Sequence, residues 1–184
     1  MTSARRFVVL FTLVVLVAWL VMAVVVYDAL PGQIPTHFGP SGAADAFATR
    51  SVGSWFALPA IGAGVTALLL WLAQVVHRKP SLFNMPGKEQ MLALTIEKQQ
   101  PLLDQIAMFT TLIATSTLLL FVAIHYDSWR VAMSAQRGLS AVSFTAMALS
   151  VSGMTFGIPL WMVRFQRDVQ AASAAMASSP RRSS

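Results

Sequence analysis

Hydrophobic and polar positions divide the chain into four long uncharged stretches separated by polar segments. The stretches cover about residues 7–26, 55–76, 106–124 and 141–163. A bilayer core about 30 Å thick needs roughly 20 apolar residues in a helix, because each residue adds about 1.5 Å. The stretches show no alternating polar face, so helices are favoured over the strands of a barrel. The sequence predicts an all-α, polytopic membrane protein with four transmembrane helices.

These helices define one membrane domain over residues 1–169, with a long loop at 27–54 and a second loop at 77–105. The first helix is expected to be retained rather than cleaved as a signal peptide, because its apolar stretch exceeds a signal core of about 7–15 residues. The segment 170–184 is rich in Ala and Ser and is predicted to be a disordered tail. The four stretches contain no ionisable residue, which disfavours ion-coupled transport.

Composition agrees with a membrane protein and makes the charge distribution informative. The chain is 56% hydrophobic and 11% charged, contains no cysteine, and carries 13 basic against 7 acidic residues. Ten of the basic residues lie in the N-terminal tail, the 77–105 loop and the C-terminal segment, and three lie in the other two loops. The positive-inside rule therefore places both termini in the cytoplasm of a bacterial inner membrane and the 27–54 loop outside it.

The basic residues flank helices and do not form one patch. This distribution favours the lipid bilayer as their partner and disfavours nucleic acid. The absence of cysteine excludes disulfides, thiolate metal sites and Cys nucleophiles.

The loop at 27–54 is the most distinctive segment. Its 28 residues far exceed what a connection between neighbouring helices needs. The runs Leu30–Gln33 and Gly39–Gly42 predict two turns, and Pro35 favours an extended conformation at Ile34. We therefore expect a long ordered extracytoplasmic loop. Long ordered loops usually carry function.

The loop also carries a recognisable string. Leu30-Pro31-x-x-Ile34-Pro35-Thr36-His37-Phe38, followed by Gly42, Asp45 and Arg50, resembles the signature loop of a bacterial and archaeal membrane domain of unknown function. That domain is found in SdpI-type immunity proteins and smaller relatives. The resemblance spans roughly residues 10–125 and implies a small multi-helix membrane protein, with no assigned catalytic residue. Some members of the wider group protect cells against secreted toxic peptides, so the resemblance also implies a possible role of this kind.

The resulting hypothesis is a non-enzymatic membrane protein whose outer loop recognises, or protects against, an external peptide or a membrane-protein partner, in an immunity-like or regulatory role. The candidate residues for this recognition all come from the loop. They are Pro35, Thr36, His37, Phe38, Gly42, Asp45 and Arg50.

A second hypothesis concerns His37, Asp45, His125 and Asp127, which all fall on the predicted outer side. Two imidazoles and two carboxylates are suitable ligands for Zn²⁺, so an outer-face metal-binding protein or hydrolase is the alternative. The favoured interpretation is structural: His37 and Asp45 hydrogen-bond the loop backbone, with Arg50, and the other two end a helix at the membrane surface. No HExxH, triad order or phosphate-binding loop occurs, so no catalytic residue or cofactor is assigned.

The fourth apolar stretch carries small residues on one helical face, including Ser150, Gly153 and Gly157. Such faces allow close helix contact, either within one bundle, which is the favoured interpretation, or in a homodimer through the GxxxG motif. Pro159 predicts a bend in this helix near Thr155.

Overall fold

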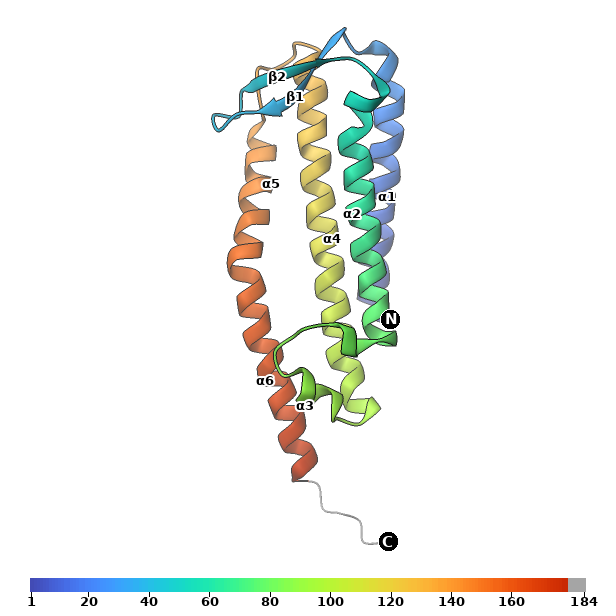
Figure 1. Cartoon of the computed structure of the whole chain (residues 1–184), viewed down its shortest axis with the longest axis vertical. Helices are drawn as coiled ribbons and strands as arrows, with labels where there is room; N and C mark the ends of the chain where they lie inside the picture. Colours follow the sequence, from blue (N-terminus) through green and yellow to red (C-terminus); the bar gives the residue numbers. More distant parts are fainter. Residues whose placement is uncertain (179–184) are drawn as a thin grey trace.

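The computed structural model describes residues 1–178 and contains, within them, four helices long and apolar enough to cross a membrane (Figure 1). They are α1 (Ser3–Val26), α2 (Val52–Arg78), α4 (Ile96–Ala132), and a fourth in which α5 (Ala141–Ser152) continues into α6 (Ile158–Ala177). The prediction of a mostly helical protein with four membrane-crossing helices is confirmed. The chain is a multi-pass membrane protein by length and composition of these helices.

The helices extend beyond the uncharged stretches that predicted them. The largest difference is in α4, which was predicted over 106–124 but runs for 37 residues, or about 55 Å. An uncharged stretch marks only the part of a helix suited to lipid, whereas the helix continues where polar side chains reach the membrane surface. As a result Arg5, His125 and Asp127 lie within helices and are buried.

The fourth helix is interrupted where Pro159 predicted a bend. A π-helical turn over Gly153–Gly157 separates α5 from α6. Proline has no N–H to donate to the carbonyl four residues earlier, and local π geometry is a common way to absorb such a defect. The helix then continues to Ala177. The prediction of a disordered tail over 170–184 is therefore wrong for residues 170–177, which are helical. Residues 179–184 lie outside the described part of the chain.

The connection between α1 and α2 contains a β-hairpin, which the all-α prediction missed. After a 3-10 turn at Tyr27–Ala29, strand β1 (Gln33–Phe38) pairs with β2 (Ala44–Thr49) in an antiparallel arrangement. The register is irregular around Thr36, which places His37 opposite Ala46. Three of the six residues of β2 are alanine and a fourth is aspartate, so local propensity gives little sign of a strand. In Figure 1 the hairpin lies across one end of the bundle.

The opposite end contains the chain's N-terminus, a 3-10 turn at Pro80–Leu82 and the short helix α3 (Lys88–Leu92) (Figure 1). An apolar cluster there joins α2, α3, α4 and α6 through Val76, Met91, Leu103, Phe165 and Val169, all nearly inaccessible to solvent. Many large apolar residues elsewhere on the helices are exposed, as expected of surfaces that face lipid.

Helices α1 and α4 are joined by three polar contacts at successive levels. Arg5 Nε donates to Thr111 Oγ1 at 3.3 Å, and the hydroxyls of Thr12 and Thr115 lie 2.7 Å apart. At the third level, Trp19 contacts His125. The three α1 residues are seven positions apart, which returns the same helix face to α4 every two turns.

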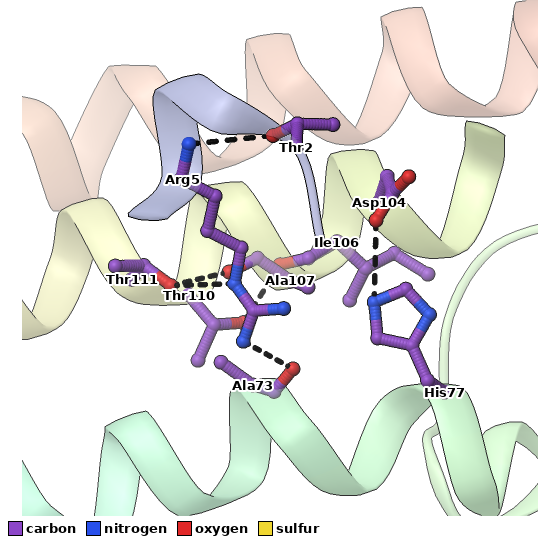
Figure 2. Close-up of polar contacts among 9 residues, drawn as sticks. All are labelled: Thr2, Arg5, Ala73, His77, Asp104, Ile106, Ala107, Thr110 and Thr111. Carbon is purple, nitrogen blue, oxygen red and sulfur yellow. Dashed lines mark hydrogen bonds and ion pairs between the residues drawn. The ribbon is translucent and has the colours of Figure 1, made fainter. Parts of the chain in front are cut away.

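Arg5 also connects a third helix, because its Nη2 donates to the carbonyl of Ala73 in α2 at 2.8 Å (Figure 2). Nearby, His77 Nε2 of α2 lies 3.4 Å from Asp104 Oδ1 of α4. These side chains hold α1, α2 and α4 together at the end away from the hairpin.

Candidate functional site

The hairpin is closed by a tight turn between its strands. Gly42 has φ of +79°, a left-handed conformation that glycine adopts readily. The backbone N–H of Gly42 donates to the Gly39 carbonyl at 2.8 Å, and that of Gly39 donates to the Ala43 carbonyl at 2.9 Å. A side chain at Gly42 would also collide with the ring of Phe144 in α5. The turn therefore rests directly on the fourth helix.

Both ends of the hairpin are fixed to the helical bundle. At its base, Arg50 Nη1 donates to the carbonyls of Leu30 at 2.7 Å and Asp28 at 3.1 Å, and its guanidinium lies 5.7 Å from the Tyr27 ring centroid. At its tip, the backbone N–H of Leu139 donates to the Gly42 carbonyl at 2.8 Å. The side chain of Ile34 is buried in an apolar cluster with Leu30 and Trp55.

His37 and Asp45 form a pair on the exposed part of the hairpin. Nδ1 of His37 lies 2.6 Å from Oδ1 of Asp45, and the two side chains are 67% and 51% exposed. The sequence predicted that these groups bond the loop backbone together with Arg50. Instead they bond each other, and Arg50 binds the carbonyls at the base of the hairpin. The difference arises because hairpin pairing brings residues eight positions apart in sequence side by side.

Four of the seven predicted loop residues line a cavity beneath the hairpin. Its volume is about 920 Å³, and its walls come from the hairpin, α2, α4 and α5. The predicted residues Pro35, Thr36, His37 and Phe38 line it, whereas Gly42, Asp45 and Arg50 do not. The helical part of the wall is mainly apolar, with Leu58, Ile61, Ile124, Phe144 and Met147 among its members.

His125 lines the same cavity and is only 2% exposed. Its Nδ1 accepts a hydrogen bond from Trp19 Nε1 at 3.0 Å, and its ring centroid lies 4.1 Å from that of Trp55. Trp55 is fixed in turn, because its Nε1 donates to the Ala23 carbonyl at 2.8 Å. The sequence expectation of a histidine at the end of a helix is wrong, since α4 continues to Ala132.

The second nitrogen of His125 has no hydrogen-bond partner. Indole N–H groups only donate, so Nδ1 must carry the lone pair, and the ring is neutral with its proton on Nε2. Nε2 is buried and makes no hydrogen bond. The acceptor nearest the ring is the Trp55 backbone carbonyl, which has no helical donor of its own because residue 59 is proline. No bond of normal geometry joins the two, and such buried donors cost about 1–3 kcal/mol.

Asp127 faces away from His125 and binds the start of α5. Its Oδ2 accepts from the backbone N–H of Ser140 at 2.6 Å and from its hydroxyl at 2.9 Å, and its Oδ1 accepts from Gln136 Nε2 at 2.9 Å. Asp127 is 1% exposed. It was expected to be an interfacial group, but its role is to connect α4 to the turn before α5.

The four residues considered for a metal site are therefore divided among three settings. His37 and Asp45 pair on the hairpin, His125 is bound by Trp19, and Asp127 is bound by Ser140 and Gln136. Within residues 1–178, no group of three or more His, Asp or Glu side chains is placed to hold a metal ion.

The small residues of the fourth helix face α4. Ser150 Oγ lies 3.4 Å from Ser116 Oγ, and Ser150, Gly153 and Gly157 line a cavity of about 200 Å³ between the two helices. A Cβ added at either glycine would meet no atom within 4 Å. The face is thus turned toward its own bundle, where packing remains loose.

The sequence alone did not indicate the interior of the site, where Trp55, Phe144 and Met147 line the cavity with His125, and Trp19 holds His125 from α1. One signal was available: Arg5, Thr12 and Trp19 recur every seven residues along the first helix. Polar and amphipathic side chains at that interval indicate one face in contact with another helix.

Fold and site together define a four-helix multi-pass membrane protein that carries a docked β-hairpin over an apolar cavity. Residues 13–63 contain a domain of unknown function (DUF1648). The match begins within α1, includes the whole hairpin and ends within α2. No curated protein and no solved structure matches the chain.

Proposed function

We propose that the chain is a non-enzymatic protein of a bacterial inner membrane whose hairpin recognises, or protects against, an extracytoplasmic peptide or protein partner. The observation that carries the proposal is the exposed His37–Asp45 pair, held at 2.6 Å on a hairpin that is anchored at both ends. A preorganised polar pair on a rigid support binds a partner without the entropic cost of ordering a free loop.

The distribution of basic residues supports the orientation. Of the 11 basic residues within residues 1–178, eight lie at the start of α1, on α6, or between the end of α2 and the start of α4, toward the end of the bundle opposite the hairpin (Figure 1). The positive-inside rule assigns that end to the cytoplasm. The hairpin then faces the outside, where secreted peptides and extracytoplasmic proteins are met.

The resemblance of the Leu30–Phe38 string to the signature loop of SdpI-type immunity proteins supports an immunity-like or regulatory role. The domain of unknown function covers this string completely. The metal-dependent or hydrolytic alternative has weaker support, because a metal at His37 and Asp45 would have no third protein ligand within the described residues.

Complementation of a deletion strain tests the proposal. The His37→Ala/Asp45→Ala double variant, at unchanged membrane abundance, is expected to lose the wild-type phenotype, including survival of secreted peptide toxins. The matched control is Gln33→Ala/Thr49→Ala, which removes another exposed cross-strand pair of the same hairpin, with Gln33 Nε2 and Thr49 Oγ1 3.5 Å apart. Full complementation by the His37/Asp45 variant would exclude recognition through this pair.

A further inference from the structure

The second strand of the hairpin, β2, has an open edge. Strand β1 packs against α2 and α4, whereas β2 packs mainly against β1. The side chains of Asp45, Phe47 and Thr49 are all exposed. Natural sheets often protect a free edge with lysine or proline, and β2 contains neither. The hairpin therefore presents an edge to which a further strand can be added.

The register of the hairpin shows which main-chain groups point to this edge. The Arg50 N–H donates to the Gly32 carbonyl at 2.9 Å, and pairs in an antiparallel ladder alternate between hydrogen-bonded and non-hydrogen-bonded. Phe47 is then in a non-hydrogen-bonded pair with Pro35, which has no N–H to contribute. The N–H and carbonyl of Phe47 consequently point away from β1, as does the N–H of Thr49.

The chain itself begins a third strand on the same edge. Gly138 forms an isolated antiparallel bridge with Ala43. The Ala43 carbonyl is bound by the Gly39 N–H on the β1 side, so the bridge occupies the outer side. Residues before Gly138 would continue along β2, but Gln136 is bound by Asp127 of α4 and the pairing stops. An antiparallel peptide would extend a pairing that the fold has started.

The side chains beside the open edge favour one class of strand. Phe47 is 54% exposed and offers its ring to the residue opposite it. Oδ1 of Asp45 is bound by His37, whereas Oδ2 makes no hydrogen bond or ion pair within residues 1–178. Cross-strand pairs of apolar residues and of opposite charges stabilise a sheet. A matching strand has an apolar residue opposite Phe47 and a basic residue two positions later, opposite Asp45.

We propose that this edge of β2 binds an extended, basic and apolar segment of an extracytoplasmic peptide as an antiparallel third strand. In such recognition the main-chain hydrogen bonds provide affinity and the side chains provide specificity. The inference rests on the recognition proposed for the hairpin, and it names the conformation and residue types of the partner. It fails by itself if the partner binds the His37–Asp45 pair without pairing to the main chain of β2.

Amide hydrogen exchange, measured by NMR on the full chain in lipid nanodiscs, tests the proposal because it reports each N–H separately. The probe is the peptide acetyl-Thr-Thr-Val-Thr-Lys-Thr-amide. Without it, the amides of Phe47 and Thr49 should exchange fast and that of Ala48 slowly, because the Ala48 N–H faces β1. At saturation the probe should slow exchange at Phe47 and Thr49 at least about tenfold.

Two altered peptides separate main-chain from side-chain recognition. In the first, N-methyl-valine replaces valine, which removes the N–H that would bind the Phe47 carbonyl. Its Kd should be about tenfold weaker. In the second, Glu replaces Lys and meets Asp45 with a like charge, and its Kd should be about threefold weaker.

Variants of Phe47 test the same bond from the protein side. Phe47→Pro and Phe47→Ala both remove the ring, but only proline removes the outward N–H. The pair with Pro35 loses no ladder bond in either variant, so Ala48 should stay protected in both. Phe47→Pro should bind the probe about tenfold more weakly than Phe47→Ala. If proline disrupts the hairpin, the N-methyl peptide on the wild-type chain decides the question.

The proposal is overturned if the probe does not bind, or if the N-methyl peptide binds as tightly as the unmodified one. Protection of the Phe47 amide that rises with protein concentration, without peptide, would assign the edge to a second copy of the chain and also overturn it. In the deletion strain, Phe47→Pro should complement less well than Phe47→Ala. Equal complementation by these two variants, with none by His37→Ala/Asp45→Ala, would overturn the edge pairing and leave recognition by the exposed pair intact.

Discussion

Trp19 and His125 are joined by a hydrogen bond of 3.0 Å from the indole N–H to Nδ1, between residues 106 positions apart in sequence. The bond connects α1 to α4 at the level of the cavity and decides which imidazole nitrogen carries the proton. Both side chains are 2% exposed. Because this contact fixes both the position of α1 against α4 and the tautomer of His125, changes on α1 are expected to affect the cavity wall.

Replacing Trp19 by Phe removes the donor and keeps an aromatic ring. Hydrogen bonds between membrane helices contribute about 0.6–1.7 kcal/mol, so we expect Trp19→Phe to lower the free energy of unfolding in detergent by about 1–2 kcal/mol, including lost packing. Trp71→Phe is the control, because Trp71 is 59% exposed and should change it by less than about 0.5 kcal/mol. Equal effects of the two changes would contradict the importance of the bond.

Gly62 of α2 lies against the Trp19 ring. An added Cβ would lie 2.7 Å from two ring carbons of Trp19 and 3.1 Å from the Phe121 ring, whereas one added at Gly64 would meet nothing within 4 Å. Gly62→Ala should destabilise the bundle by about 1–3 kcal/mol through overpacking. Gly64→Ala should be neutral or stabilising, because alanine favours the helix. Thermal unfolding of both variants in one detergent makes the comparison, and a stable Gly62→Ala protein would contradict the packing.

Arg5 connects three helices at the other end of the bundle. It is 1% exposed and donates to Ala73 of α2 and Thr111 of α4. Hydrogen bonds from charged groups contribute about 1.5–3 kcal/mol each, so Arg5→Ala should lower unfolding free energy by about 2 kcal/mol or more. The exposed neighbour Arg6 provides the control, and Arg6→Ala should have little effect. Chemical unfolding in detergent measures both, and similar results would show that Arg5 is not held as described.

The hairpin turn depends on Gly42. With φ of +79°, alanine there costs about 1–2 kcal/mol in backbone strain, and its Cβ would collide with Phe144. Gly42→Ala should therefore loosen the hairpin, seen as faster amide hydrogen exchange over residues 33–49. Gly32→Ala is the control, because nothing lies within 4 Å of an added Cβ there and its φ is not positive. Unchanged protection in the Gly42 variant would contradict a turn that rests on α5.

The four helices could be predicted because lipid imposes one simple requirement, a long uncharged stretch, that is written locally in the sequence. The hairpin could not be predicted in the same way. The Ala44–Thr49 strand has weak local preference for strand structure, and its pairing depends on anchors supplied by Arg50 and by Leu139, which is distant in sequence. Such long-range contacts have no local signature.

The same distinction applies to the site. The loop residues around His37 stood out through turn signals and the recognisable string. The burial of His125 had no such signal in the sequence. It arises because α4 continues beyond the uncharged stretch and because Trp19 of α1 and Trp55 of α2 pack against the imidazole. The surroundings of His125 can therefore be described only when the relative positions of α1, α2 and α4 are known.

The chain has no native cysteine, so the extracytoplasmic position proposed for the hairpin can be tested directly. Ser41→Cys in the hairpin turn and Ser81→Cys between α2 and α3 change the same residue type at exposed positions at opposite ends. In spheroplasts, a membrane-impermeant maleimide should label the Ser41 variant without permeabilisation and the Ser81 variant only after it. Labelling in the reverse order would place the hairpin in the cytoplasm and contradict its role in extracytoplasmic recognition.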